Sequence, residues 1–305
     1  MTNAPIAIFG YNRADNLHRL IENLRGCDGF DQSPVHIFID GPKGPGDEPA
    51  VLRTRDYVRS LRDANIRYTL REENRGLRQS IYTGVSEVVA EHGRVIVLED
   101  DLKLTQGALD YFNSALKKYA KDDRIWSVCG YMYEVIETAK QSDALILPFA
   151  HPWGWATWER SWSKFDIAAA PDAATMHSQD FIKSFDLNGS YPFATQLQQS
   201  ALGNLNGWYI HWYYTIFKEK GLSVFPPRRV LDNNGLTGGT HGSSLNPFRF
   251  FRRKTQPMEG AVKLPDAVVP DIWFLDHLKR STEMKLHKFV ARAGMIKRRL
   301  KRMAS

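Results

Sequence analysis

The sequence predicts an α/β fold, a doubly wound and mostly parallel sheet flanked by helices, followed by a helical appendage at the C-terminus. Between residues 5 and 130, short apolar runs alternate with longer segments whose apolar residues recur at helical spacing. The run from Val95 to Leu98 is aliphatic at every position, as in strands buried on both faces. Alternating strands and helices of this kind form parallel sheets. A chain of 305 residues can bury a core large enough for such a sheet.

Five strands are expected in this part of the chain. Residues 5–10 and 35–40 are rich in isoleucine, valine and phenylalanine, which favour strands, and a Gly-Pro-rich turn closes the second run. Residues 66–70 form the third expected strand. The central strand begins after Gly93, and residues 126–130 form the fifth.

The segments between these strands are predicted to be amphipathic helices that each turn one apolar face to the sheet. The first of them has Leu17, Leu20, Ile21 and Leu24 at helical spacing. Helices are expected over residues 15–24, 50–61, 76–91, 105–119, 213–220 and 271–279. We expect a main domain over residues 1–245, with halves 1–131 and 132–245, and a basic helical extension over residues 246–305.

The formal net charge of +7 comes from one end of the chain. Residues 284–305 contain eight Lys and Arg residues and no Asp or Glu, which leaves 33 Lys and Arg against 34 Asp and Glu elsewhere. A neutral body argues against a nucleic-acid partner. Apolar residues recur at helical spacing within the basic end, which is typical of a helix on an anionic membrane surface. The alternative is that this apolar stripe packs on the body.

No apolar run is long enough to span a bilayer, and the N-terminus lacks a signal-peptide pattern. The two cysteines, Cys27 and Cys129, have no metal-binding spacing. We therefore expect a cytoplasmic protein, peripheral on the cytoplasmic face of the inner membrane.

Three carboxylates, Glu99, Asp100 and Asp101, follow the central strand directly. Adjacent anions at a strand end repel one another, and the carboxyl ends of strands in open α/β sheets are where ligands bind. One interpretation is that a divalent cation, Mg²⁺ or Mn²⁺, joins Asp101 to a phosphorylated substrate. The alternative is that the acidic residues cap the next helix.

The other strand ends carry polar residues but no known phosphate-binding glycine motif. Tyr11, Asn12 and Arg13 follow the first strand, which excludes a spaced-glycine dinucleotide site or a P-loop there. Asp40 ends the second strand, where a carboxylate could accept hydrogen bonds from a base or ribose; turn formation is the more frequent role of such an Asp.

Taken together, these features resemble the nucleotide-sugar-binding half of GT-A glycosyltransferases, of the N-acetylglucosaminyltransferase I type and related bacterial enzymes of surface-polysaccharide assembly. The resemblance covers about residues 5–245. It rests on an ordered set of motifs: Tyr11-Asn12-Arg13, Asp40, Glu73 to Leu77, Glu99-Asp100-Asp101, His151 to Trp158, Trp208 to Trp212, Asn234-Gly235-Leu236 and Thr240-His241-Gly242.

The resemblance implies a role for each matching position. Asp101 would ligate Mn²⁺ or Mg²⁺, Asp100 would contact the ribose and Glu99 the donor sugar. The remaining nucleotide-sugar-binding candidates are Tyr11, Arg13, Asp40, Arg78, Trp155 and His241. Asp40 would hold the base, Arg13 would reach the base or phosphate region, and His241 would lie in a loop over the donor. His241 is also a possible metal ligand, since imidazole suits Mn²⁺.

The catalytic base is the least defined part of the site. The N-acetylglucosaminyltransferase I type has an Asp between two tryptophans, where this chain has Tyr209, Ile210 and His211. His211, Glu159 and Asp232 are the candidates for the base of an inverting reaction; a retaining mechanism would need none. A structural role for His211 is an alternative.

Four tryptophans lie within ten residues, from Trp153 to Trp162. Aromatic faces match the C–H face of a sugar, so Trp155 is a candidate contact and Gly154 would allow a ligand to approach the backbone. The alternative is that these rings cover the core.

The resemblance implies a hexosyl- or N-acetylhexosaminyltransferase that uses a nucleotide-diphosphate sugar, with a UDP-sugar as first choice. The acceptor would be a glycan, lipid-linked, in bacterial O-antigen or capsule assembly. The alternatives are a nucleotidyltransferase and a non-catalytic carbohydrate-binding assembly subunit.

Overall fold

A mixed sheet of eight strands lies at the centre of the fold. The structure is a computed structural model that describes residues 3–135, 142–233, 257–258 and 260–291. The strand order is β3-β2-β1-β4-β8-β6-β9-β7, and a separate two-stranded ribbon pairs β10 with β5. In the eight-stranded sheet only β8 and β7 run against the common direction of the other described strands. The predicted α/β class with a mostly parallel sheet flanked by helices is therefore confirmed.

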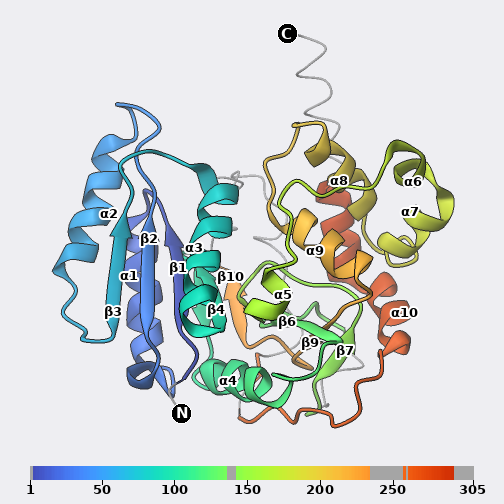
Figure 1. Ribbon diagram of the computed structural model, residues 1–305. Helices are drawn as coiled ribbons and strands as arrows, with labels where there is room; N and C mark the ends of the chain where they lie inside the picture. The colour runs from blue at the N-terminus through green and yellow to red at the C-terminus, as the bar shows by residue number, and fades with distance from the viewer. Residues whose placement is uncertain (1–2, 136–141, 234–256, 259, 292–305) are drawn as a thin grey trace.

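The N-terminal part follows the predicted alternation of strands and helices closely (Figure 1). Its elements are β1 (Ile6–Gly10), α1 (Ala14–Arg25), the 3₁₀ helix η1 (Phe30–Gln32), β2 (Val35–Ile39), α2 (Glu48–Ser60), β3 (Ile66–Leu70), α3 (Gly76–His92) and β4 (Arg94–Glu99). The central aliphatic run is buried as expected, since Val95 to Leu98 are at most 1% exposed.

The second part contains shorter elements. They are β5 (Leu102–Leu104), α4 (Ala108–Lys118), β6 (Ile125–Cys129), β7 (Leu145–Leu147), β8 (Trp155–Trp158), α5 (Glu159–Trp162), α6 (Ala173–His177), α7 (Gln179–Phe185), α8 (Phe193–Ala201), α9 (Tyr209–Lys218), β9 (Leu222–Phe225), β10 (Leu231–Asn233) and α10 (Ile272–Arg280). The strand expected at 126–130 corresponds to β6. The helix expected at 105–119 begins three residues later, because Thr105 continues the ribbon and donates its N–H to the carbonyl of Val230.

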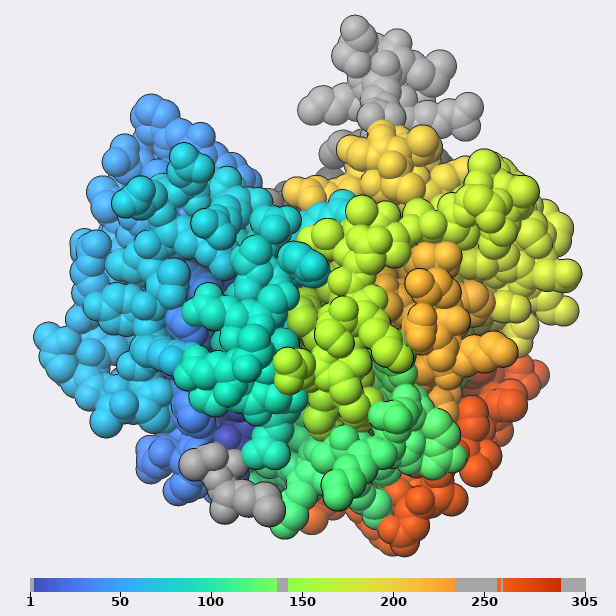
Figure 2. All heavy atoms as spheres, viewed as in Figure 1, coloured from blue at the N-terminus to red at the C-terminus, as the bar shows by residue number. Residues whose placement is uncertain are grey.

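The two faces of the sheet are covered by different helices. Side chains alternate along a strand, so Trp155 and Trp158 of β8 point to opposite faces. Trp158 donates to the carbonyl of Leu116 in α4, whereas Trp155 packs against Trp212 of α9. On the α9 side, Figure 2 shows α3 meeting the segment 159–170, where Trp162 Nε1 donates to Ser86 Oγ at 2.9 Å.

The described part of the C-terminal extension packs against the body. Asp271 accepts a hydrogen bond from the backbone of Ile146, and α10 buries Phe274 and Leu278 completely. A second helix, over residues 282–291, buries Met284 and leaves Phe289 67% exposed. The rest of the predicted apolar stripe lies outside the described residues. Within the described chain, no helix has the length and apolarity needed to cross a membrane.

Candidate functional site

Three carboxylates and one guanidinium meet where β4 leaves the sheet. Glu99 is the last residue of β4, and Asp100 and Asp101 form the turn into β5. Arg13 follows β1, the parallel neighbour of β4. Because the two strands are parallel, both turns lie at the same carboxyl edge, where open α/β sheets bind ligands. The resemblance assigned these residues to one nucleotide-sugar site, and the structure places them at the same edge of the sheet.

Arg13 bonds both aspartates. Its Nε donates to Asp100 Oδ2 at 3.2 Å, its Nη2 donates to Asp100 Oδ1, and its Nη1 donates to Asp101 Oδ2 at 3.3 Å. Burial lowers the pKa of Arg13, but the attraction of Asp100 and Asp101 outweighs it and the pKa is raised. Arg13 is therefore a permanent cation that partly neutralises this edge.

The three carboxylates differ in their surroundings. Burial raises the pKa of Glu99 to about 8, aided by the charges of Asp101 and Asp100 and opposed by Arg13. Burial also raises the pKa of Asp100 to about 7, although Arg13 opposes this shift. In the described part of the chain, the Glu99 side chain has no hydrogen bond. Above these pKa values one cation faces three ionised carboxylates, and the excess negative charge favours binding of a further cation.

Asp101 is the more accessible of the two aspartates: its side chain is 14% exposed, against 2% for Asp100. Asn233 Nδ2 donates to Asp101 Oδ1 at 3.3 Å. Sequence analysis missed Asn233, which reaches this site because β10 pairs antiparallel with β5 and sets Asn233 opposite Leu102. Its position next to Asp232 and the Asn234-Gly235-Leu236 motif was the available signal.

The oxygen donors of this edge suit Mg²⁺ or Mn²⁺ in type. Among the described residues, no three His, Cys, Asp or Glu side chains converge as a ready-made metal cage. Such a set fits a cation that takes one carboxylate, here Asp101, and draws its remaining ligands from substrate phosphates and water.

Asp40 is engaged by the backbone. Its carboxylate accepts from the N–H groups of Arg75, at 3.1 and 3.0 Å, and of Gly76, at 2.8 Å. Those groups lie at the start of α3, where unpaired N–H groups and the helix dipole favour an anion. Asp40 therefore fastens the turn after β3 to the end of β2, and this explains its position without a nucleotide.

Tyr11 and Arg78 lie at either side of the edge. The Tyr11 hydroxyl donates to Asp47 and accepts from the backbone N–H of Lys43 at 3.0 Å, so it organises the turn after β2. Arg78, in the first turns of α3, donates to the carbonyl of Ile167. Burial lowers the pKa of Arg78. Their hydrogen bonds thus fix the turn after β2 and join the start of α3 to the segment around Ile167.

Trp155 lies in the core and not in an open sugar site. It belongs to β8, is 1% exposed, and stacks on Trp208 at a centroid distance of 5.1 Å. Gly154 has a positive φ of 55°, and a Cβ there would meet Leu231 Cδ2 at 2.1 Å. Leu231 thus fills the space beside Gly154. Close packing of Leu231, and not the expected approach of a ligand, explains the glycine at this position.

The three candidates for the base lie in different places. His211 is 1% exposed, with Nε2 at 2.7 Å from Ser200 Oγ and Nδ1 at 2.8 Å from the carbonyl of Ala169, and burial lowers its pKa. This geometry matches the structural alternative. Glu159 is exposed and follows β8 at the amino end of β4, opposite the carboxylates, because its N–H donates to the Gly93 carbonyl.

Asp232 lies in β10, opposite Lys103 of β5, and accepts from Arg229 Nε at 2.7 Å. It is one residue from Asn233 and thus near the carboxylate edge, although Arg229 takes up one of its oxygens. His241, the remaining site candidate, lies outside the described residues.

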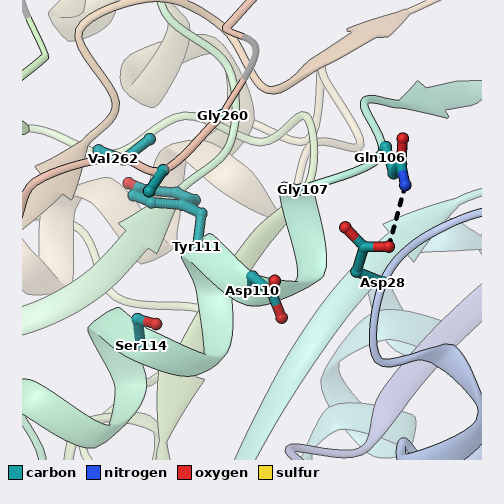
Figure 3. A pocket seen from close by; sticks show the side chains of 9 residues that line it. Asp28, Gln106, Gly107, Asp110, Tyr111, Ser114, Gly260 and Val262 are labelled. Carbon is teal, nitrogen blue, oxygen red and sulfur yellow. Dashed lines mark hydrogen bonds between the residues drawn. The ribbon is translucent and has the colours of Figure 1, made fainter.

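One pocket is lined by Lys103 and Asp232 of the two-stranded ribbon, close to the carboxylate edge, and another lies farther away. Figure 3 shows a pocket of about 350 Å³ at the start of α4, where Gln106 Nε2 donates to Asp28 at 3.0 Å. Asp28 follows the end of α1, whereas Arg13 precedes its start. The pocket therefore lies toward the opposite edge of the sheet.

No family model matches the chain. Three solved structures are similar to parts of it. The mannosyltransferase PcManGT from Pyrobaculum calidifontis, in complex with GDP-Man and Mn²⁺, is 12% identical, with a TM-score of 0.41 over 72% of this chain and 69% of that one. GalNAc-T7 with UDP, GalNAc and Mn²⁺ is 10% identical, with a TM-score of 0.48 over 74% and 43%. TarS from S. aureus is 14% identical, with a TM-score of 0.34 over 46% and 24%. This chain spans less than half of the last two. Likenesses of this strength assign neither a family nor a substrate.

Proposed function

We propose that this protein is a glycosyltransferase that moves a sugar from a nucleotide-diphosphate donor to a glycan acceptor. The observation that carries the proposal is the meeting of Arg13 with Asp100 and Asp101 at the carboxyl edge of β1 and β4. These residues come from two of the motifs on which the resemblance to GT-A glycosyltransferases rests. Their contact supports the idea that the motifs form one site.

The proposed donor site uses each charge differently. Asp101, the more accessible aspartate, would hold Mn²⁺ or Mg²⁺ together with the donor's diphosphate. A bound cation supplies Lewis-acid neutralisation of the charge that develops on the departing diphosphate. Arg13 would turn from the aspartates toward the donor's phosphate or base region when a cation takes its place. Asp100 would face the ribose, and Glu99 would accept hydrogen bonds from the donor sugar.

Other expected contacts become supporting roles in this proposal. Asp40 would act by fixing the start of α3 next to the base, because its oxygens are already bonded to Arg75 and Gly76. Tyr11 and Arg78 would shape the walls of the nucleotide pocket. His241 is proposed as a donor-loop residue or metal ligand.

We extend the proposal to a UDP-sugar donor, hexosyl or N-acetylhexosaminyl, with inversion at the anomeric carbon. A lipid-linked glycan acceptor in bacterial O-antigen or capsule assembly is supported by the basic C-terminal segment and by the 67% exposure of Phe289. Cations beside an exposed aromatic ring favour the surface of an anionic membrane. The protein would then be peripheral on the cytoplasmic face.

A thermal-shift panel tests the donor site. UDP, GDP and CMP are each added with Mn²⁺, Mg²⁺ or EDTA to the wild type, to Asp101→Ala and to Asp180→Ala, an exposed aspartate of α7. A ligand of the native state raises stability by RT ln(1 + [L]/Kd), about 2.7 kcal/mol at a hundredfold excess over Kd. We expect one nucleoside diphosphate to stabilise the wild type and Asp180→Ala in the presence of metal, and not Asp101→Ala.

The same panel, extended by nucleoside triphosphates with and without a sugar phosphate, separates the alternatives. The absence of stabilisation by any nucleotide under any metal condition would contradict the donor site and favour a carbohydrate-binding subunit. Stabilisation by nucleoside triphosphates alone, with release of pyrophosphate from a sugar phosphate, would favour a nucleotidyltransferase.

A further inference from the structure

The helix over residues 282–291 holds a carboxylate and an imidazole one turn apart against the body. The Glu283 side chain is 3% exposed; one of its oxygens accepts from the Tyr131 hydroxyl and the other from the backbone N–H of Glu134. His287 Nε2 lies 3.6 Å from Glu283 Oε1, and the His287 side chain is 15% exposed. A buried carboxylate held by two donors is thus paired with a histidine that reaches the surface.

Aromatic rings surround His287. Its ring centroid lies 5.6 Å from that of Tyr133 and 6.1 Å from that of Trp153. Trp153 also packs edge-on against Tyr131 and His151, and these contacts hold its ring in place. Trp153 is only partly buried, unlike Trp155. Flat apolar faces with polar edges are what a pyranose ring needs for stacking.

This aromatic cluster lies at the same edge of the sheet as the carboxylates. Val97, Trp155 and Cys129 lie opposite one another on β4, β8 and β6. Neighbouring strands are about 4.8 Å apart. The strands β8 and β4 run antiparallel. Trp153 lies two residues before Trp155, and Glu99 lies two residues after Val97, so both lie at the same edge of the sheet.

Gly154 lies between the two clusters. It follows Trp153 in the sequence, and a Cβ on it would lie 3.5 Å from a methyl group of Leu102, the residue after Asp101. An acceptor sugar beside Trp153 would thus lie on the carboxylate side of the sheet.

We propose that His287 is the general base of the transfer and that Glu283 is its positioning residue, in an acceptor-sugar site beside Trp153, with the buried Tyr133 behind it. The inference rests on the proposed glycosyltransferase function. The acceptor oxygen forms its bond to the anomeric carbon of the donor while its proton passes to the imidazole of His287. The bond from that carbon to the diphosphate oxygen breaks, and the diphosphate leaves with the electron pair. Glu283 stabilises the imidazolium, and the single displacement inverts the anomeric configuration.

The other candidates for the base serve this role less well. Both ring nitrogens of His211 are engaged inside the core, and Glu159 lies at the opposite end of β4. Asp232 is bonded to Arg229. The basic C-terminal extension, whose apolar stripe is expected either on a membrane surface or against the body, would thus contribute to the active site.

The test measures turnover of UDP-glucose, UDP-N-acetylglucosamine and GDP-mannose with Mn²⁺ by the full chain, with water and with a panel of p-nitrophenyl glycosides as acceptors. His287→Gln should lower kcat by about 10²- to 10⁴-fold, the usual contribution of a general base, while the donor KM stays within about twofold. His92→Gln, at the end of α3 on the opposite edge, should behave as the wild type.

Glu283→Gln adds a readout that a purely structural role would not move. The titratable groups near His287 include Glu283 on its own helix and Tyr133 opposite, with Tyr131 and His151 behind them. Loss of the Glu283 carboxylate should lower kcat and leave the donor KM within about twofold, a split that a loss of folded protein would not produce. Melting curves verify folding, and the partly exposed His287 carries the test if Glu283→Gln does not fold.

Wild-type turnover by His287→Gln, within about twofold, would overturn the inference, as would a product that retains the donor's anomeric configuration. A wild type that binds no nucleoside diphosphate and turns over no donor would instead contradict the proposed glycosyltransferase, and this inference with it. Metal-dependent nucleotide binding by His287→Gln with loss of turnover supports both.

Discussion

Arg13 holds Asp100 with two of its guanidinium nitrogens, across the boundary between the turn after β1 and the turn after β4. Asp100 is 2% exposed, while the Arg13 side chain retains 26% of its exposure. A two-point bond from a partly exposed arginine to a buried carboxylate is strong and specific in geometry. It also leaves Arg13 able to reach a ligand that arrives from solvent.

Removal of Arg13 should leave Asp100 without its partner at pH 8, and the carboxyl, with a folded pKa of about 7 even beside Arg13, can then take up a proton. Because proton uptake limits the penalty, we expect Arg13→Met to cost about 1–3 kcal/mol of unfolding free energy at pH 8. The loss should be smaller at pH 5, where Asp100 takes a proton, and the Asp100→Asn exchange should restore much of it. Urea unfolding at both pH values measures this. The matched control is Arg25→Met, whose pair with Asp63 is on the surface and worth at most about 1 kcal/mol.

The raised pKa values of Glu99 and Asp100 predict a falling stability with rising pH. Their pKa values are about 8 and about 7 in the folded state, above the ordinary values of unfolded chains. The folded state therefore binds more protons than the unfolded state between about pH 4 and 8, and unfolding free energy falls across that window. Their contribution is complete below pH 4 and is lost as pH rises through the folded pKa values.

Glu99→Gln isolates this effect. Its unfolding free energy should fall less between pH 5 and 8.5 than that of the wild type, by at least about 1.4 kcal/mol, the equivalent of one pKa unit. Urea unfolding without metal provides the measurement. Parallel pH curves for the two proteins would contradict the raised pKa of Glu99. Saturating Mn²⁺ and nucleotide should reduce the difference, because a bound cation favours the ionised carboxylates.

We expect the main effect of replacing Asp40 to be a loss of folding stability. Asp40→Ala removes the acceptors of the Arg75 and Gly76 N–H groups, and loss of such a helix-start acceptor costs about 0.5–2 kcal/mol. Chemical denaturation tests this against Asp56→Ala, an aspartate of α2 whose side chain is 70% exposed, for which we expect no measurable loss. An Asp40→Ala protein of wild-type stability that lost only nucleotide binding would instead support the direct base contact.

The N-terminal half was predictable because one physical rule governs it. Val95 to Leu98 are aliphatic since β4 is covered on both faces, and the helix spacing around Leu17 and Ile21 reports one buried side. Arg13 and Asp101 could be grouped from strand ends alone, because parallel neighbours end at the same edge.

The second half resisted the same approach. Trp155 to Trp158 form a central antiparallel strand, but four residues with tryptophan at each end carry no clear strand period, and the cluster suggested a sugar platform. The Asn233 contact with Asp101 depends on a three-residue ribbon whose register no local pattern encodes. Glu283 meets Tyr131 across 152 positions of sequence, so only the folded chain brings them together.

Gly154 supplies a final test, because its neighbour explains it better than a ligand does. Alanine there must adopt a φ of 55° and place its methyl group 2.1 Å from Leu231 Cδ2, so overpacking should add to backbone strain. We expect Gly154→Ala to cost about 2–4 kcal/mol, from about 1 kcal/mol of left-handed strain and 1–3 kcal/mol of overpacking. Gly189→Ala, with a φ of 78° and open space around it, should show the strain alone.

In the Leu231→Ala background the added cost of Gly154→Ala should fall toward that of Gly189→Ala, since the clashing methyl is gone. Thermal or urea unfolding of the four proteins measures the coupling, and an undiminished cost in the double variant would show that Leu231 is not what excludes a side chain at this position.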